Sequence, residues 1–272
     1  MLAEKRRQVI IDAITARGSM SNTELSRQFK VSVETISRDV ILLDNQGILR
    51  RTHGGALSIN SIEPDFADLM SVNIKGKRAI GRRAALLVPD KVSVIIDSGT
   101  TAFCVAEALA NHSGLTVVTA GLQAANFLAG RNGNEVILTG GQFLASEGAT
   151  LGRDATRMLD NYYADFSFIG SGVISPHPWL MDFSREAAEL RAVMLVQARN
   201  SVVLADHMKF NRMATHRVRN FEQAAYLITD RMPDAKTART FRSFKGEILV
   251  ARPTKAPRRS DQRPGAAAGA RA

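Results

Sequence analysis

The chain has 272 residues, of which 45% are hydrophobic and 23% charged, and its formal net charge is +10. This length allows two domains that each bury a hydrophobic core, and the composition is that of a globular protein and excludes a low-complexity chain. No apolar run approaches the ~18 residues of a membrane-spanning helix, and the N-terminus does not resemble a signal peptide. Cys104 is the single cysteine, so no disulfide can form within the chain, and we expect a cytoplasmic protein. We expect its thiol to be buried and structural, and we expect no membrane partner.

The first 59 residues predict three short helices followed by a hairpin. Residues 3–17 have apolar side chains at helical spacing, and Ser21 with Glu24 forms a capping box that starts a second helix with Leu25 and Phe29 facing inward. Ser32 can cap a third helix. Its inward side chains are expected to be Val33, Ile36, Val40 and Leu43. Two short strands, 48–51 and 56–59, are predicted around a His-Gly-Gly turn.

This layout is typical of a winged helix-turn-helix, which places its recognition helix in the DNA major groove. The predicted DNA contacts lie in the first half of the third helix and on the wing: Ser32, Glu34, Thr35, Ser37, Arg38, Arg50, Arg51 and His53. Arg38 would bond a guanine or a phosphate. The alternative is that Arg38 and Asp39 belong to a solvated helix face and that the wing arginines are ordinary surface charge.

After a polar connection at 60–75, the chain alternates helices with strands. The strands are expected at 92–96, 115–119, 135–139, 165–169, 201–205, 226–229 and 247–250. Such alternation predicts a Rossmann-like, doubly wound and mostly parallel sheet. We therefore expect four segments: a winged helix-turn-helix at 1–59, a linker at 60–76, an effector-sensing α/β domain at 77–251 and a disordered basic tail at 252–272.

Small or polar residues follow five of these strands, where open parallel sheets bind ligands. Gly99, Thr100 and Thr101 open a helix whose N-terminus would bind phosphate, and Lys209 would add a positive charge. Asp97, Asp182 and Asp206 would accept hydrogen bonds from sugar or polyol hydroxyls. The remaining candidates for effector binding are Ser98, Thr119, Gly140, Gly141, Gly170, Gly172 and Glu186.

The segment from Val31 to Ala56 resembles the N-terminal signature of the DeoR family of bacterial transcriptional regulators, whose core is T-I-R-R-D-L followed by R-x-H-G-G-A. Thr35-Ile36, Arg38-Asp39 and the stretch from Arg51 to Ala56 match this pattern. Ser37 stands in place of the first arginine and Val40 in place of leucine. The Ser37 substitution marks the position at which the operator would differ from those of relatives.

The resemblance continues through DSGTT at 97–101, LTGG at 138–141, FSFIGSGVI at 166–174, DFSREAAELR at 182–191 and ADHMKF at 205–210. It implies a fold similar to ribose-5-phosphate isomerase, a phosphorylated sugar or polyol effector, and homo-oligomers that repress carbohydrate-use operons on operator DNA. Arg191 stands where the family often has lysine, and an arginine usual near Met70 is missing.

Two other functions remain open from the residues. A sugar-phosphate isomerase would need a carboxylate base, for which Glu186 and Asp182 are candidates and His177 or His207 alternatives, but residues 169–172 contain no carboxylate. A nucleic-acid-binding protein without sequence preference would use the tail, which holds six Lys/Arg against one acidic residue. No catalytic residue, metal site or cofactor is expected.

Overall fold

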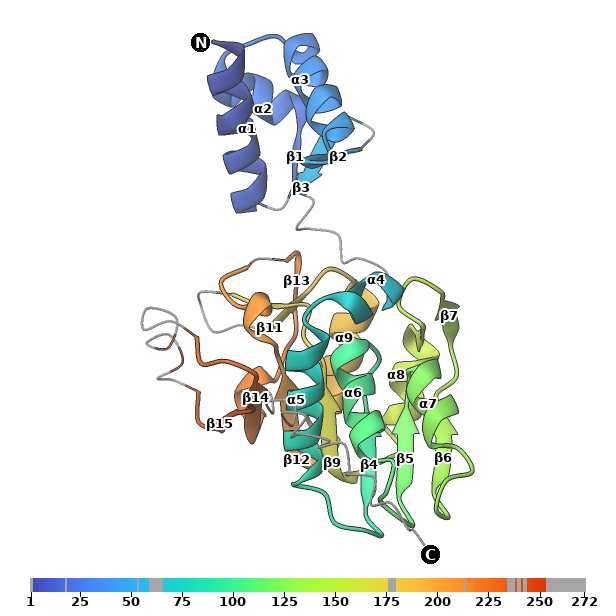
Figure 1. Ribbon diagram of the computed structural model, residues 1–272. Coiled ribbons are helices and arrows are strands. Elements are labelled where there is room, and N and C mark those ends of the chain that lie inside the picture. The colour runs from blue at the N-terminus through green and yellow to red at the C-terminus, as the bar shows by residue number, and fades with distance from the viewer. Residues whose placement is uncertain are drawn as a thin grey trace, which may run out of the picture.

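The computed structural model describes residues 2–17, 19–52, 54–58, 66–175, 180–212, 214–233, 238, 241 and 244–252. Residues 2–58 form a small head and residues 66–252 an α/β body (Figure 1). His53, His177, Pro64 and the tail after Arg252 lie outside the described residues, so the predictions on them stay predictions.

The head contains three helices and a three-stranded antiparallel sheet with β3 in the middle. Its elements are α1 (Ala3–Arg17), β1 (Ser19–Ser21), α2 (Asn22–Phe29), α3 (Val33–Asn45), β2 (Leu49–Thr52) and β3 (Gly55–Ser58). The predicted capping box is confirmed: the Ser21 N–H donates to Glu24 Oε2 at 2.8 Å, and the Glu24 N–H donates to Ser21 Oγ at 3.2 Å. Strand β1 was not expected from the sequence.

The core of the head buries Ile36, Val40 and Leu43 of α3 against α1, α2 and β2, as their spacing predicted. Val33 was expected to face inward but is 40% exposed, because the first residue of a helix extends past the neighbouring elements. Asp39 is buried and bonds Arg6 of α1, with 2.6 Å between its Oδ2 and the arginine Nε. The alternative that Asp39 belongs to a solvated face is therefore wrong.

The body is built on a seven-stranded parallel sheet, which confirms the predicted fold class. The strand order is β15-β14-β12-β9-β4-β5-β6. These strands are β4 (Ser93–Ile96), β5 (Thr116–Thr119), β6 (Glu135–Leu138), β9 (Ala164–Ile169), β12 (Ala198–Leu204), β14 (Tyr226–Thr229) and β15 (Glu247–Val250). Each lies within three residues of its predicted position.

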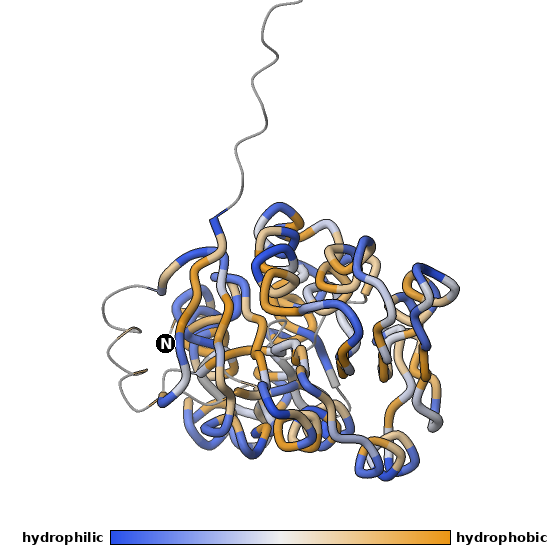
Figure 2. Tube along the Cα trace, turned by 90° about the horizontal axis from the view of Figure 1, so that it is seen from below, coloured by the Kyte–Doolittle hydropathy of each residue, from blue (hydrophilic) through white to orange (hydrophobic). Residues whose placement is uncertain are grey.

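Helices cover both faces of the sheet, so the body has three layers. One face carries α5 (Ile74–Ala85), α6 (Thr100–Ala108) and α7 (Leu122–Leu128), and the other α8 (Arg153–Leu159) and α9 (Arg185–Met194). Because successive strand residues point to opposite faces, Ile95 packs with the α8–α9 layer while Val94 and Ile96 pack with the other. Figure 2 shows hydrophobic stretches inside the body and hydrophilic ones along its outer turns.

Several short elements were not predicted. They are α4 (Phe66–Ser71), β7 (Gln142–Leu144), β8 (Ala149–Leu151), β10 (Val173–Ile174), β11 (Leu180–Asp182), β13 (His216–Arg217) and the 3-10 turns η2 (His207–Lys209) and η3 (Phe221–Gln223). Helix α4 occupies part of the expected polar connection. It is held by tertiary contacts that sequence periodicity does not report: Lys77 Nζ donates to the Leu69 carbonyl at 2.5 Å, and the Phe66 ring meets the Phe103 ring edge-on.

Cys104 lies on α6 with 1% of its surface exposed, and burial raises the pKa of its thiol to about 12. The prediction of a buried thiol is confirmed. Among the described residues, no helix combines the length and the apolarity needed to cross a membrane.

Candidate functional site

The first half of α3 presents polar side chains on the outside of the head. Glu34 and Arg38 are exposed, and Thr35 and Ser37 are half-buried beside them. Ser32 Oγ accepts from the Thr35 N–H at 3.2 Å and so caps the helix. Hydrogen bonds from the helix N–H of Glu34 and from Ser32 lower the pKa of the Glu34 carboxyl, so this side chain is an acceptor that suits a cytosine amino group.

The wing is shaped by its two glycines. Gly54 has φ +90°, a conformation that side-chain-bearing residues rarely adopt, and a Cβ on Gly55 would lie 2.9 Å from Ser21 Cα of β1. The wing therefore packs directly on β1. Arg50 and Arg51 are exposed, and the Arg51 N–H donates to Asp44 Oδ1 at 3.0 Å, which ties the wing to the end of α3.

A pocket lies beyond the carboxyl ends of β4 and β9. Strand β4 pairs with β5 on one side and with β9 on the other, so the chain order of the sheet reverses between β4 and β9. Parallel sheets bind ligands at such a switch point. The space between its lining residues is about 440 Å³ when the part open to solvent is counted.

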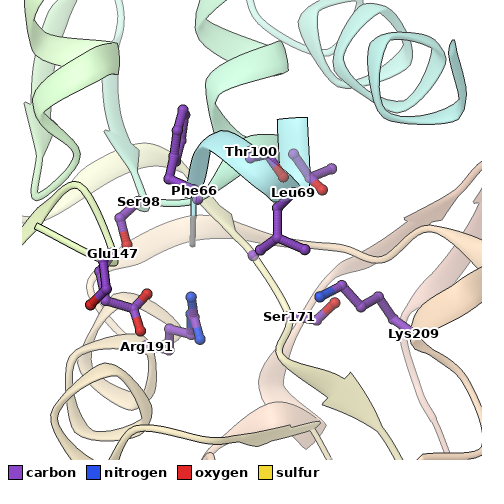
Figure 3. A pocket seen from close by; sticks show the side chains of 12 residues that line it. Phe66, Leu69, Ser98, Thr100, Glu147, Ser171, Arg191 and Lys209 are labelled. Carbon is purple, nitrogen blue, oxygen red and sulfur yellow. The ribbon is translucent and has the colours of Figure 1, made fainter. Parts of the chain in front are cut away.

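One side of the pocket is arranged to receive an anion. Gly99 has φ +91° and caps α6 without a side-chain hydrogen bond, and the first N–H groups of a helix have no partner within that helix. Thr100 and Thr101, the next two residues, also line this side of the pocket. Its other lining residues are Ser171, which follows β9, and Lys209 of η2. Figure 3 shows the Lys209 ammonium group directed into the pocket beside Ser171.

A buried cluster of two carboxylates and one guanidinium lies next to the pocket. Arg191 Nε donates to Asp97 Oδ2 at 2.7 Å, and its Nη1 forms an ion pair with Asp182. Asp97 also accepts from the Gly170 N–H at 2.8 Å and from the Ser98 N–H at 2.8 Å. The cluster thus fixes the ends of β4, β9 and β11 around the pocket, while Arg191 itself lines the cavity.

Comparison with known proteins decides the family. Residues 6–62 match the DeoR-like helix-turn-helix domain, and residues 72–231 match the DeoR C terminal sensor domain. The chain belongs to the DeoR family of transcriptional regulators. As a member, it is a DNA-binding transcription regulator, and the pocket lies in its sensor domain.

Relatives with assigned names align with most of this chain. The Glycerol-3-phosphate regulon repressor of Haemophilus influenzae is 32% identical over 84% of this chain and 90% of its own. The HTH-type transcriptional repressor CsqR of Escherichia coli is 30% identical over 90% of this chain and 94% of its own. Among solved structures, ribose 5-phosphate isomerase A of Methanocaldococcus jannaschii is 17% identical over 49% of this chain and 53% of its own, with a TM-score of 0.36.

The pocket brings together six of the candidates from the sequence: Ser98, Gly99, Thr100, Thr101, Gly170 and Lys209. The other eight do not line it. Asp97 and Asp182 are bonded to Arg191, Asp206 accepts from the Met208 N–H to start η2, and Thr119 accepts from the Gly121 N–H. Gly140, Gly141, Gly172 and Glu186 are also absent from its lining. A role for any of the fourteen in effector binding stays a prediction.

Six lining residues were not candidates: Phe66, Leu69, Ser146, Glu147, Ser171 and Arg191. Arg191 carried a signal, because a charged residue among the apolar inner positions of α9 requires buried partners. Ser146 and Glu147 lie in the turn between β7 and β8, and Phe66 and Leu69 lie on α4. None of these elements was visible as a sequence pattern.

Proposed function

We propose that this regulator is a repressor of a carbohydrate or polyol utilisation operon, and that a phosphorylated sugar or polyol relieves repression by binding in the pocket. The observation that carries the proposal is the anion-receiving side, where the N-terminus of α6 and Lys209 face one cavity. The name of the Haemophilus influenzae relative, a Glycerol-3-phosphate regulon repressor, supports the same class of signal.

Contacts of α4 and α5 support a route from the pocket to the head. Phe66 and Leu69 of α4 wall the pocket, and α4 is the first described element after the connection to the head. The Phe66 N–H donates to the Ser146 carbonyl at 3.0 Å, so α4 is bonded to another wall. A ligand touching both walls would bias the position of α4 and, through it, the connection.

A second route begins at η2, which carries Lys209. The His207 N–H donates to Asp230 Oδ1 at 2.7 Å, and Asn73, at the start of α5, donates to Asp230 Oδ2 at 3.0 Å. Burial raises the pKa of Asp230, but the hydrogen bonds from Asn73 and His207 outweigh it and lower the pKa overall. The ionised carboxylate therefore couples η2 to the junction of α4 and α5.

The heads would act in pairs, because repressors of this architecture bind two half-sites through a symmetric oligomer. We propose a homo-oligomer in which effector binding changes the relative placement of the heads and so weakens operator affinity. An activator could use the same head and the same pocket. Measuring operator occupancy with and without effector distinguishes activation from repression.

We propose that the body senses its ligand without converting it. Isomerisation needs a carboxylate base and a partner acid near the reacting carbons. Among the described residues that line the pocket, which do not include His177, Glu147 is the one carboxylate, and there is no histidine, cysteine or tyrosine. Of the carboxylates proposed from the sequence, Asp182 is paired with Arg191, and Glu186 is exposed at the start of α9.

The test is a thermal-shift and operator-release panel of sugar and polyol phosphates, repeated on Lys209→Ala. Lys209→Ala should keep operator affinity and raise the effector concentration for half-release by about ten-fold or more, since a hydrogen bond to a charged group contributes ~1.5–3 kcal/mol. Lys245→Ala, an exposed lysine outside the pocket, is the control. A wild-type protein that responds to no phosphorylated compound would refute the proposal.

A further inference from the structure

A second cavity of the body lies along α5, and we call it the α5 cavity. It is bounded by the C-terminal half of α5, the end of α6 and the end of β15. Figure 1 shows α5 and α6 side by side on one face of the sheet. The volume of the α5 cavity is about 640 Å³, which is in the range of small-molecule sites. It shares no lining residue with the pocket beyond β4 and β9, so it is a separate site.

Most of the α5 cavity is lined by aliphatic side chains. Seven of its eleven lining residues are alanine, valine or leucine. Leu86, directly after α5, is 79% exposed, and Val250, at the end of β15, is 39% exposed. Covering such side chains with an apolar group is favourable, because it removes their surface from water. This lining therefore suits the apolar body of a ligand.

The charged groups of the α5 cavity are all basic. Its four other lining residues are Arg82, Arg83, His112 and Arg252, and no carboxylate is found among the described residues that line it. Within the described part of the chain, the guanidinium groups of Arg83 and Arg252 have no ion pair or hydrogen bond. The C-termini of α5 and α6 contribute only about half a negative elementary charge each. The two guanidinium groups outweigh this, and the cavity attracts an anion.

This charge disfavours two occupants that the chain itself could supply. The sequence after Arg252 holds five Lys/Arg against one acidic residue, so the tail is repelled by a basic cavity. A symmetric pair of chains that met at this surface would bring the same arginines of both copies together. Like charges in close contact destabilise such a pair. An external anion is the occupant that complements the cavity.

We propose that the α5 cavity binds a small amphiphilic anion. Arg83 and Arg252 hold its acidic group, and its apolar body covers Leu86 and Val250. A guanidinium group suits a carboxylate or a phosphate, because its N–H donors can form two parallel hydrogen bonds with either. A sugar phosphate lacks the apolar body, so this site takes a different class of compound from the proposed effector.

The α5 cavity is placed to affect the sensor pocket through α5. The helix spans 12 residues, or about 18 Å, from the cavity to its first turn. There Asn73 donates to Asp230, which also bonds η2, the element that carries Lys209. A ligand in the α5 cavity thus contacts the helix that the second route to the head uses.

The test is a fluorescence titration of the full chain with 8-anilinonaphthalene-1-sulfonate, an aromatic ring system that carries one sulfonate. One molecule should bind per chain, and octanoate should displace it. Acetate lacks the apolar body and 1-octanol lacks the charge, so each should need a concentration at least about ten-fold higher. Equal displacement by octanoate and 1-octanol overturns the inference. Displacement by phosphatidylglycerol vesicles but not by octanoate overturns it too, because the surface would then bind a membrane.

Two variants locate the bound probe. Arg83→Gln and Arg252→Gln each remove one positive charge and should each weaken binding of the sulfonate by about ten-fold, with an unchanged melting temperature. The control is Arg153→Gln, an exposed position on α8 at the other face of the sheet, which should bind like the wild type. Wild-type binding in both arginine variants overturns the inference. Weaker binding in Lys209→Ala would instead place the probe in the sensor pocket and overturns it as well.

Discussion

Arg191 illustrates how one residue can organise a site without being predicted as part of it. Its planar guanidinium sends donors in different directions, so that it bonds Asp97 and Asp182 at once. A lysine ammonium group at this position would lack that fixed fork. The guanidinium, which bonds both buried carboxylates, therefore links the loop after β4 to the end of β11.

Replacing Arg191 with methionine should destabilise the protein strongly. Two buried carboxylates would then face each other without a counter-charge, and breaking a buried pair in this way costs about 3–5 kcal/mol. Chemical denaturation at neutral pH measures the loss. Arg185→Met on the same helix removes an exposed pair with Glu189 and should have little effect. Equal effects of the two substitutions would show that Arg191 is not needed to hold Asp97 and Asp182.

Arg38 is the residue from which operator specificity is expected. Removing it in Arg38→Ala should cost about 1–3 kcal/mol at the operator if it reads a base. The measurement is binding to an operator obtained by selection from random DNA, beside binding to unrelated DNA. Lys5→Ala, an exposed position on α1, is the control. A similar loss on both DNAs would instead assign Arg38 to a phosphate.

At the scale of elements, α4 is the helix that we expect to carry the signal from the pocket. It has six residues and would not be stable alone, because helices of this length lack enough internal hydrogen bonds. Its position depends on contacts to Phe103, Ser146 and Lys77, which belong to three different parts of the body. A small helix held in this way responds readily to a change in any one of its contacts.

The substitution Lys77→Met should separate ligand binding from operator release. It removes the bond from Nζ to the Leu69 carbonyl without replacing any of the residues that line the pocket. Effector affinity by titration should change little, whereas the effector-induced loss of operator affinity, typically about 1–3 kcal/mol in coupled systems, should fall by roughly half.

The control for this experiment is Lys75→Met, an exposed neighbour on α5. If Lys77→Met reduced effector affinity and operator release in parallel, or behaved like Lys75→Met, α4 would not be the coupling element.

At the scale of the whole molecule, the sequence predicted the architecture because regular elements carry periodic patterns. Runs such as VSVII and SVVLA are long enough and apolar enough to be recognised as buried strands, and Ser21 with Glu24 marks a helix start locally. The fold class and the head follow from such local signals, and the structure confirms both.

The pocket could be predicted only in part, because its composition depends on strand order. All five polar clusters lie at the same edge of the sheet, but only those after β4, β9 and β12 contribute residues to the pocket. Thr119 ends β5 and Gly140 follows β6, both farther from the switch point. Asp97 was expected to face a ligand and instead bonds Arg191, a partner 94 positions away that no local pattern identifies.

Charge distribution limits how the molecule finds its DNA. The first 59 residues hold nine Lys/Arg against six Asp/Glu, so the head is only mildly basic. We therefore expect the general attraction of the head to DNA phosphates to be weak, and operator recognition to depend on a few side chains of α3 and the wing.

The single cysteine of the chain has a practical consequence. Cys104 lies on α6, the helix whose N-terminus faces the pocket, and its thiol is shielded and protonated in the native state. Alkylation of this thiol requires the structure around α6 to open, through local or global unfolding, so the rate of modification measures that opening. A ligand bound at the N-terminus of α6 would stabilise this helix and slow the alkylation of Cys104. The rate of alkylation of the wild-type protein would thus report ligand binding in the pocket.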